Sequence, residues 1–333
     1  MDLFTHILVA YLITFGIVGF QPSYLAAGAL AGGLPDADAL FYPISRRFPI
    51  LRHHGITHSI FGVTVIAIAG GLVAPLIVPG SGLIYFVVME AGGLAHVGQD
   101  AFTNFSVPPL LPFSDRRLSL DADRAVNFAT MIVSVLSFYL LLGVERNRVP
   151  FGEYLLTVYA LTVFFVLYFA VRLAARVHIG RRLKSLGDFD VVIPSSNPFE
   201  WTILSERRSA GRIRTNYAKY VFGRGIVRGP FAADVPLEPT PGDTGPIRSA
   251  TEALERSYPL ARRASRLLDD TYHFGEAHDA GPEGWVATWY SLEFTAFGRA
   301  AGVRVRFPPS GEPPIVRASW NVPPWRRRAH QPS

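Results

Sequence analysis

The sequence predicts a membrane all-α helical bundle of about six spans, some of which could re-enter the membrane, followed by a small cytoplasmic α+β domain. Three observations predict this class. Apolar residues make up 49% of the 333 residues, and the mean hydropathy is +0.24. Only 23 of the 58 charged residues fall in 1–184, whereas the shorter stretch 185–333 holds 35. Uncharged apolar runs approaching the ~20 residues needed to cross a bilayer recur in the first stretch. We therefore expect a membrane-embedded domain at 1–184 and a cytoplasmic domain of unassigned role at 185–333.

Three of the six expected spans, at 59–79, 125–143 and 154–171, contain no Asp, Glu, Lys or Arg. The other three are apolar stretches that ionisable side chains interrupt: 3–20, 23–43 and 83–104. Whether 23–43 crosses or re-enters stays open. The first residues lack the positive region and cleavage site of a signal peptide, so we expect the first span to be retained.

Basic residues predict the orientation. Arginines and a lysine gather in 46–52, in 116–124 and in 172–184, after the second, fourth and sixth expected spans. The positive-inside rule then predicts a multi-pass protein of the plasma (inner) membrane with both termini cytoplasmic. With this orientation, the expected polar positions lie toward the cytoplasmic face: His6, Asp36, Asp38, His53 to His58, His96 and Asp100.

The second stretch has the pattern of strands and one helix. Apolar and polar residues alternate at 201–208 and 212–222, and Ser209-Ala210-Gly211 between them is typical of a hairpin turn. The other expected elements are strand-like runs and a helix: 189–193, 249–268 (the helix), 285–294 and 303–307.

Composition excludes several kinds of site. With no cysteine, the chain has no disulfide, thiolate zinc site or cysteine nucleophile, so a metal site must use His, Asp or Glu. The net charge of +6 permits contact with a polyanion, and for so apolar a chain the membrane surface is the nearer one. We expect no specific nucleic acid.

The strongest local motif is His53-His54-Gly55-Ile56-Thr57-His58-Ser59, just before an uncharged run. His54 and His58 share a face if the segment is helical, and His53 and His58 converge if the glycine breaks the helix. Either arrangement presents two imidazoles to one ion. The alternative is an interfacial loop whose histidines are merely solvated.

Two further polar pairs interrupt expected spans. His96 and Asp100 stand at i and i+4, which stacks them on one helical face, and ionisable groups at membrane depth usually mark a functional site. The alternative is a buried pair in which Asp100 only orients His96. Asp36 and Asp38 follow Pro35, where the helix should break. They are candidates for a carboxylate that bridges two ions, although such a sequence is also an ordinary turn.

In order and spacing these motifs resemble the YdjM/YbcI-type family of inner-membrane metal-dependent hydrolases, also described as LexA-binding. The matching pieces are Met1-Asp2, Thr5-His6, Leu34-Pro35-Asp36-x-Asp38, His53-x-Gly55-x-Thr57-His58-Ser59, His96-x-x-x-Asp100 and Pro112-Phe113-Ser114. The segment from Pro194 to Trp201 resembles the one that follows the last span in longer members. The resemblance covers residues 1 to about 205.

The family's polar pattern is similar to that of the zinc-dependent phospholipase C and S1/P1 nuclease group, which holds zinc ions for phosphoester hydrolysis. This resemblance implies a set of metal ligands: His6, Asp36, His58, His96 and Asp100, with His53 and Asp38 as further candidates. His54 stands where the family usually has Arg. No later His-x-x-x-Glu pair is present, so we do not expect a full three-metal cluster.

We therefore expect a metal-dependent hydrolase with one or two divalent ions, most simply Zn²⁺, acting on a phosphoester of a lipid or membrane-associated substrate at the cytoplasmic face. The catalytic candidates are Asp38 and Asp100, as general base or histidine orienter, and His54. The first rival is a non-enzymatic scaffold or regulator with a structural metal site and a protein partner for 185–333. A transporter ranks third, because its path would need polar groups through the full membrane thickness.

Overall fold

The computed structural model describes residues 1–41, 54–146, 150–236, 246–264, 273–296, 299–310 and 312–321. The chain divides into two compact units. The first comprises Met1–Val177 together with Pro194–Pro198, and the second comprises His178–Ile193 together with Phe199–Ser333. Each unit is described by itself.

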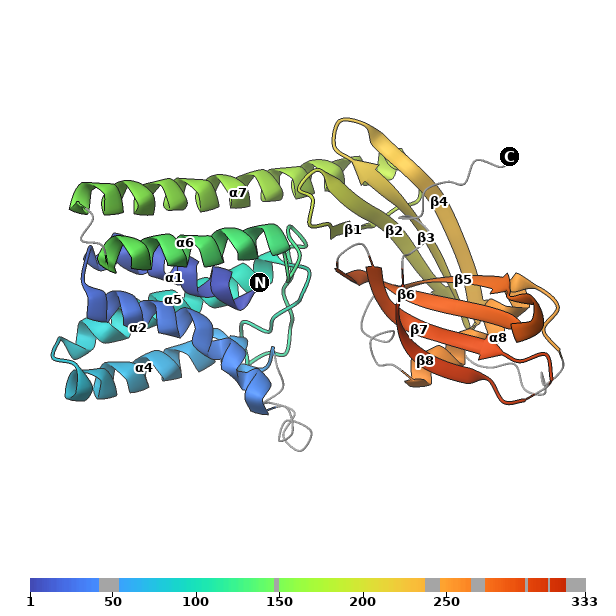
Figure 1. Cartoon of the computed structure of the whole chain (residues 1–333), viewed down its shortest axis with the longest axis horizontal. Coiled ribbons are helices and arrows are strands. Elements are labelled where there is room, and N and C mark those ends of the chain that lie inside the picture. Colours follow the sequence, from blue (N-terminus) through green and yellow to red (C-terminus); the bar gives the residue numbers. More distant parts are fainter. Residues whose placement is uncertain are drawn as a thin grey trace. The chain divides into compact units, whose positions relative to one another are not determined.

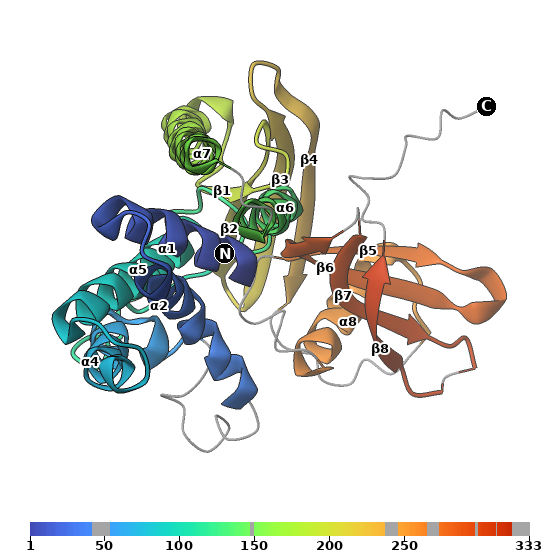
Figure 2. The same cartoon turned by 60° about the vertical axis from the view of Figure 1, so that its left-hand side comes forward.

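The first unit is built from helices (Figure 1). In chain order they are α1 (Leu3–Val18), α2 (Pro22–Gly33), the 3-10 helices η1 (Leu34–Phe41) and η3 (Ile56–His58), α4 (Ile60–Ile77), α5 (Gly82–Phe102), α6 (Phe128–Arg146) and α7 (Phe151–Leu186), whose last residues belong to the second unit. Helix α5 packs against α1, α2 and α4, and α1 also packs against α6 (Figures 1 and 2).

Local sequence explains where the site-bearing helices begin and end. Asp2 caps α1 by accepting a hydrogen bond from the Thr5 backbone N–H at 3.0 Å, and the Ser59 hydroxyl caps α4 by accepting from Gly62 N–H at 3.0 Å. Helix α2 changes to the tighter η1 at Leu34, one residue before Pro35. Proline cannot donate a backbone hydrogen bond, so an α-helix does not continue undisturbed through it. The predicted helix break at Asp36 is therefore present.

The prediction of a six-span bundle is wrong. Among the described residues, only α4 and α7 are long and apolar enough to cross a membrane. Helix α1 has 16 residues, or about 24 Å at 1.5 Å per residue, against a hydrocarbon core of about 30 Å. Helix α2 has only 12 residues, α5 carries four polar side chains at Glu90 and 96–100, and the apolar part of α6 ends at Leu141.

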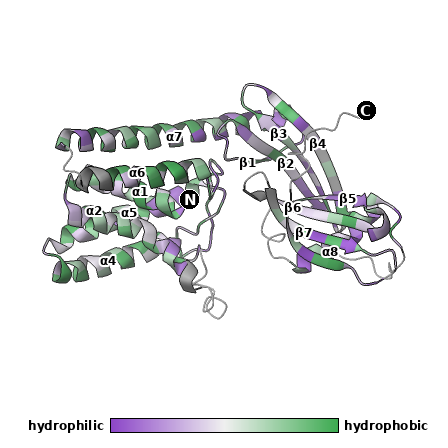
Figure 3. Cartoon of the chain, viewed as in Figure 1, coloured by the Kyte–Doolittle hydropathy of each residue, from purple (hydrophilic) through white to green (hydrophobic). Residues whose placement is uncertain are grey.

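Apolar residues run along every long helix of the first unit (Figure 3), so hydropathy alone does not distinguish α4 and α7 from their neighbours. The apolar surface of α4 and α7 is mostly open, with 11% and 17% of their apolar windows buried. Helix α1 instead contributes Leu8, Leu12 and Phe15 to a core that α6 and α7 complete with Leu141 and Phe165. A sequence window does not distinguish these two uses of an apolar helix.

Close helix contacts bring α1, α2 and α5 together at the positions of small residues. A Cβ added at Gly92 of α5 would lie 2.3 Å from the Gly28 carbonyl of α2, and one at Gly32 would lie 2.4 Å from Ala10 Cβ of α1. Both distances are too short for a real side chain, so only glycine permits these approaches. Gly32 lies about one turn before Asp36 in the chain, and Gly92 lies one turn before His96.

The second unit contains two four-stranded antiparallel sheets in sequential order. The first is β1 (Val191–Pro194), β2 (Glu200–Ser209), β3 (Arg212–Val221) and β4 (Gly225–Pro236); the second is β5 (His273–Asp279), β6 (Trp285–Ala296), β7 (Arg299–Phe307) and β8 (Ile315–Asn321). The predicted hairpin is confirmed as β2 and β3, and its turn has positive φ at Ala210 and Gly211.

Helix α8 (Ala250–Ala264) packs against the second sheet. Its Ser257 hydroxyl accepts a hydrogen bond of 2.9 Å from the indole N–H of the fully buried Trp289. The last four residues of the helix predicted at 249–268 lie outside the described residues.

Candidate metal centre

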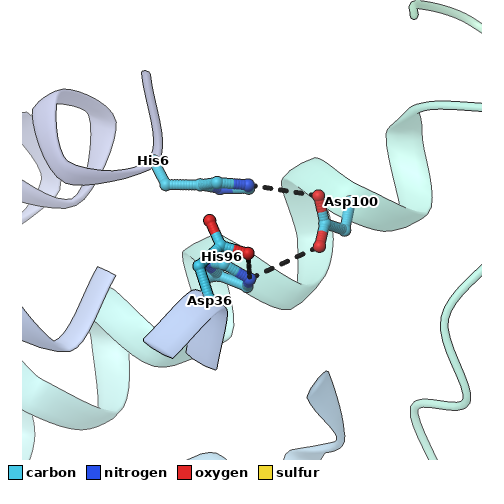
Figure 4. Close-up of side chains that lie close together, drawn as sticks. All are labelled: His6, Asp36, His96 and Asp100. Carbon is cyan, nitrogen blue, oxygen red and sulfur yellow. Dashed lines mark hydrogen bonds and ion pairs between the residues drawn. The ribbon is translucent and has the colours of Figure 1, made fainter. Parts of the chain in front are cut away.

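Five of the predicted ligands converge from four elements of the first unit. They are His6 of α1, Asp36 of η1, His58 of η3, and His96 and Asp100 of α5. One ligand atom from each of His6, Asp36, His96 and Asp100 lies within 4.8 Å of the others (Figure 4). A second group, His54, His58 and Asp100, meets the same criterion. Asp100 belongs to both groups, so these clusters have the composition and spacing to hold one or two metal ions.

His96 shows most directly that a cation fits between these side chains. Its Nδ1 lies 2.8 Å from the Gly32 carbonyl oxygen. A carbonyl only accepts, so Nδ1 carries the proton and donates. Nε2 then faces Asp100 Oδ2 at 3.4 Å and Asp36 Oδ1 at 3.8 Å. Nε2 and Asp100 Oδ2 are buried and have no hydrogen-bond partner among the described residues.

An imidazole lone pair and carboxylate oxygens repel one another when they share a buried space, and the repulsion ends when a cation lies between them. The backbone carbonyl behind Nδ1 is also the usual partner of a metal-binding histidine, because it fixes the tautomer and the ring orientation. The donor set around His96 therefore fits a divalent ion of the zinc type.

His58 repeats this arrangement with a carboxylate in place of the carbonyl. Its Nδ1 lies 3.3 Å from Asp38 Oδ2, and the Thr57 hydroxyl donates to the same Oδ2 at 2.5 Å. Its Nε2 lies 3.5 Å from both Asp36 Oδ1 and Asp100 Oδ2. Asp38 is therefore behind His58, on the side away from the cluster, and the structure favours orienting the ring over general-base catalysis for this carboxylate.

The electrostatics of η1 and η3 follow from these contacts. Burial by itself lowers the pKa of His58, but the contacts with Asp36 and Asp38 outweigh burial and raise it to about 9. Burial raises the pKa of Asp36, and its contact with His58 and the nearby His96 hold it below the usual value. Asp36 is therefore ionised at neutral pH, as a metal ligand must be.

His6 completes the first group from the start of α1. Its Nε2 lies 3.1 Å from Asp100 Oδ1, and its ring stacks on His96 with centroids 3.8 Å apart. The Asp2 cap holds the first turn of α1, and so the position of His6, in place. The amino group of Met1 also contacts Asp100.

His54 reaches the cluster through an unusual backbone conformation. Its φ is 59°, a region that costs energy for a residue with a side chain and that often occurs at functional sites. Its Nδ1 lies 3.9 Å from Asp100 Oδ2, and its ring stacks on His58 with centroids 4.6 Å apart. His54 lies in a turn and His58 in a 3-10 helix, so they do not share an α-helical face, although both face Asp100.

One predicted ligand, His53, and one further ionisable residue of α5, Glu90, lie outside this cluster or outside the described residues. His53, like Arg46, Arg47 and Arg52, lies outside the described residues. Glu90 accepts a hydrogen bond of 2.8 Å from the Thr64 hydroxyl, within the contact between α4 and α5. The reasoning from sequence missed the Gly32 carbonyl, for which the motif gives no signal, because every residue has a carbonyl.

A second buried polar cluster in the first unit was not predicted from the sequence. Arg172 of α7 and Asp123 are fully buried and form an ion pair of 2.9 Å. Asn127 donates to Asp123 at 3.1 Å, and the Tyr168 hydroxyl also contacts Asp123. Arg172 further donates to the Ser195 carbonyl at 3.2 Å. Arg172 was predicted to be a charge that flanks the sixth span, whereas it is a buried residue inside α7.

The helices of the first unit, two of which could cross a membrane, and the buried His/Asp cluster define a class of membrane-associated protein able to hold metal. The family model described as YdjM inner membrane protein matches residues 1–179. The chain therefore belongs to the YdjM inner membrane protein family, as the motifs had indicated. Comparison with curated proteins and with solved structures gave no match.

Proposed function

We propose that this protein is an integral membrane metal-dependent hydrolase that acts on a phosphoester of a lipid or membrane-associated substrate at the cytoplasmic face. The observation that carries the proposal is the arrangement of His58 and His96. In each ring one nitrogen is held by a protein acceptor, and the other faces the carboxylates of Asp36 and Asp100.

The proposal assigns two overlapping donor sets around Asp100, which favours two Zn²⁺-like ions over one. The first set is His6, Asp36, His96 and Asp100, and the second is His54, His58 and Asp100. When bound, such ions supply Lewis-acid activation of water and of a phosphoryl oxygen at neutral pH.

The chain's own residues would prepare this site. Asp38 and the Gly32 carbonyl fix the ring orientations of His58 and His96, so that the second nitrogen of each ring faces the cluster, where metal would displace any proton that it carries. Asp36 has the most exposed carboxylate of the first donor set, with 20% of its side chain accessible, against 2% for Asp100. We therefore assign the Asp36 side of the cluster as the side from which water and substrate approach.

The proposed topology has α4 and α7 anchoring the first unit in the membrane, with the site and both termini on the cytoplasmic side. Arg172 holds α7 against the loop that follows α5, at the same end of the unit as His96 and Asp100. Basic residues accumulate at that end, at 116–124 and at Arg176, which pairs with Asp121 at 3.9 Å. Exposed arginines at the bilayer surface attract anionic head groups.

The test is to purify the chain in detergent, supplement it with Zn²⁺, and measure bound metal for the wild type and for His58→Ala, His96→Ala and Asp100→Ala. We expect metal in the wild type and a strong loss in all three variants, whereas His278→Ala, at an exposed position in β5, should retain it. If the wild type binds no metal, the proposal fails.

A second measurement separates catalysis from a structural role. Vesicles of phosphatidylglycerol and phosphatidic acid are incubated with the metal-loaded protein, and the released phosphoryl products are quantified. Turnover that is lost in the three variants supports a hydrolase. Metal binding without turnover, together with capture of a protein partner by the second unit, would favour the scaffold or regulator.

A further inference from the structure

The loop between α5 and α6 carries an apolar tip that the proposed catalytic role does not use. Residues 108–113 have the sequence Pro-Pro-Leu-Leu-Pro-Phe. Phe113 is 83% exposed and Leu110 is 51% exposed. Removing large apolar side chains from water is favourable, so two neighbouring exposed ones favour a surface that covers them.

The tip has a defined conformation, because backbone hydrogen bonds close it. Val107 and Leu118 exchange two hydrogen bonds, of 3.0 and 2.8 Å, at its base. Phe113 N–H donates to the Leu110 carbonyl at 2.8 Å within it. Val107 is fully buried among Val63, Val97 and Ala101. The two apolar side chains are therefore presented on a fixed support.

The tip continues the apolar outer face of the candidate span α4. Ile60, the first residue of α4, donates its N–H to the Pro109 carbonyl at 3.0 Å, and the ring of Phe61 meets that of Phe113 edge to face with centroids 6.0 Å apart. Only 11% of the apolar window of α4 is buried within the protein. The same environment that covers α4 therefore extends to the tip.

Positive charge in the same loop indicates which kind of surface covers the tip. Arg116 and Arg117 are exposed and lie just beyond the tip, after Ser114 and Asp115. Arg117 donates to the Ser106 carbonyl at 2.8 Å and to the His54 carbonyl at 3.3 Å, so this arginine lies beside the metal cluster. An apolar tip next to exposed arginines is the pattern of a segment seated in the head-group region of an anionic bilayer.

We propose that the tip of the loop, Leu110 to Phe113, inserts into the anionic leaflet next to α4 and so sets the depth of the metal cluster at the level of the lipid phosphates. This insertion, called the seating of the tip, is inferred from the loop and its surroundings and does not depend on the proposed function. Its consequence, that a lipid phosphoester reaches the cluster from within the bilayer plane, rests on the proposed function.

The absence of cysteine makes the test direct. Phe113→Cys and Leu110→Cys in the full chain each give one thiol for a nitroxide label, after reconstitution in vesicles of phosphatidylcholine with phosphatidylglycerol. Collision rates with oxygen, which concentrates in lipid, and with a nickel chelate, which stays in water, report the depth of each label. Leu72→Cys, exposed on α4, is the lipid control, and Asp115→Cys, two residues beyond Phe113, is the aqueous control.

We expect the oxygen-to-nickel ratio at residues 110 and 113 to be severalfold above that at 115 and close to that at 72. A ratio equal to the one at 115 would overturn the proposal. Protection from both reagents would also overturn it, since it would show a protein surface on the tip. A lower ratio in vesicles without phosphatidylglycerol, and in Arg116→Gln, would support the role of charge, and unchanged ratios would overturn that role.

This experiment is independent of catalysis. The depth of the labels should not change when a chelator removes metal. Labels in lipid on a protein that binds no metal would uphold the seating and refute the hydrolase. Labels in water on an active hydrolase would refute the seating and uphold the hydrolase.

Discussion

At the scale of single residues, the site depends on which nitrogen of each imidazole contacts a protein acceptor outside the cluster, because the other nitrogen then faces the cluster. His96 is held by a backbone carbonyl and His58 by a carboxylate. A carboxylate behind a histidine makes the ring a stronger ligand and fixes its orientation. Mutation can remove the partner of His58, because that partner is a side chain. The partner of His96 is a backbone carbonyl, which a substitution does not remove.

Asp38→Asn is expected to weaken metal binding without abolishing it. The amide keeps the size of the side chain but removes the charge that orients His58, and loss of such a partner typically reduces metal affinity about 10–100-fold. Competition with a chromogenic chelator measures the change. Asp115→Asn, at an exposed position, is the control and should match the wild type. Equal affinity in Asp38→Asn and the wild type would show that Asp38 does not act through His58.

Metal affinity should also depend on pH through His58. Its pKa is raised from 6.5 to about 9 in the metal-free protein, so at neutral pH the metal-free ring holds a proton that metal must displace. Affinity should therefore rise with pH up to about 9, by about tenfold per pH unit for one displaced proton, and level off above it.

Chelator competition across this range measures the slope. Asp38→Asn removes one of the two contacts that raise the pKa, so its affinity should level off at a lower pH than that of the wild type. A flat profile for the wild type between pH 6.5 and 9 would contradict the assignment of His58 as a ligand.

At the scale of elements, the spacing of α2 and α5 decides whether the ligands meet. Gly92 lies one turn before His96, and His96 donates to the carbonyl of Gly32 on α2. The glycine contacts therefore serve the geometry of the site as well as packing, since a larger side chain at the crossing would separate the ligand from its support.

Gly92→Ala is accordingly expected to destabilise the first unit and weaken metal binding. The added Cβ would lie 2.3 Å from a backbone carbonyl, which cannot move aside as a side chain can, and overpacking of this kind costs about 1–3 kcal/mol. Gly98→Ala on the same helix is the matched control, because nothing lies within 4 Å of its added Cβ. It should be neutral or stabilise the helix by up to about 1 kcal/mol.

Thermal unfolding in detergent and metal content measure both effects. If the two variants unfold at the same temperature and bind metal equally well, the crossing of α2 and α5 does not control the site.

At the scale of the whole molecule, the sequence predicted which residues the structure brings together better than it predicted the membrane topology. The spacing of His96 and Asp100 and the break at Pro35 are local patterns, and local geometry decides them. The number of spans depends instead on which apolar helices the protein covers. Helix α1 is apolar because it supplies a core, and its residues do not reveal this until α6 and α7 are placed against it.

The same limit explains Asp38 and Arg172. The motif places Asp38 two residues from Asp36, but only the fold shows that the two carboxylates approach His58 from opposite ring nitrogens. Arg172 contacts Asp123, which lies 49 positions before it in the chain. It also contacts Ser195 of the first unit, which lies 23 positions after it. No pattern in a single sequence links such distant residues, so the reading of Arg172 as a flanking charge could not be corrected before the fold was known.

The ion pair of Asp123 and Arg172 gives the prediction that belongs to this scale. It joins α7 to the loop after α5 and to the segment Pro194–Pro198, and both side chains are fully buried. Asp123→Asn leaves the charge of Arg172 uncompensated in the interior, which typically destabilises a protein by about 3–5 kcal/mol. We expect a marked fall in the unfolding temperature in detergent.

A second ion pair of the same residue types provides the control. Arg207 contacts Asp190 in the second unit, where the two side chains are 53% and 43% exposed. Asp190→Asn should leave the unfolding temperature close to that of the wild type, because exposed pairs gain little. The double variant Asp123→Leu with Arg172→Met removes both buried charges and should recover most of the loss, since apolar replacement of a buried pair is often neutral or stabilising. If Asp123→Asn and Asp190→Asn are equally mild, the buried pair does not hold the first unit together, and the position of α7 relative to the metal cluster must depend on its apolar contacts alone.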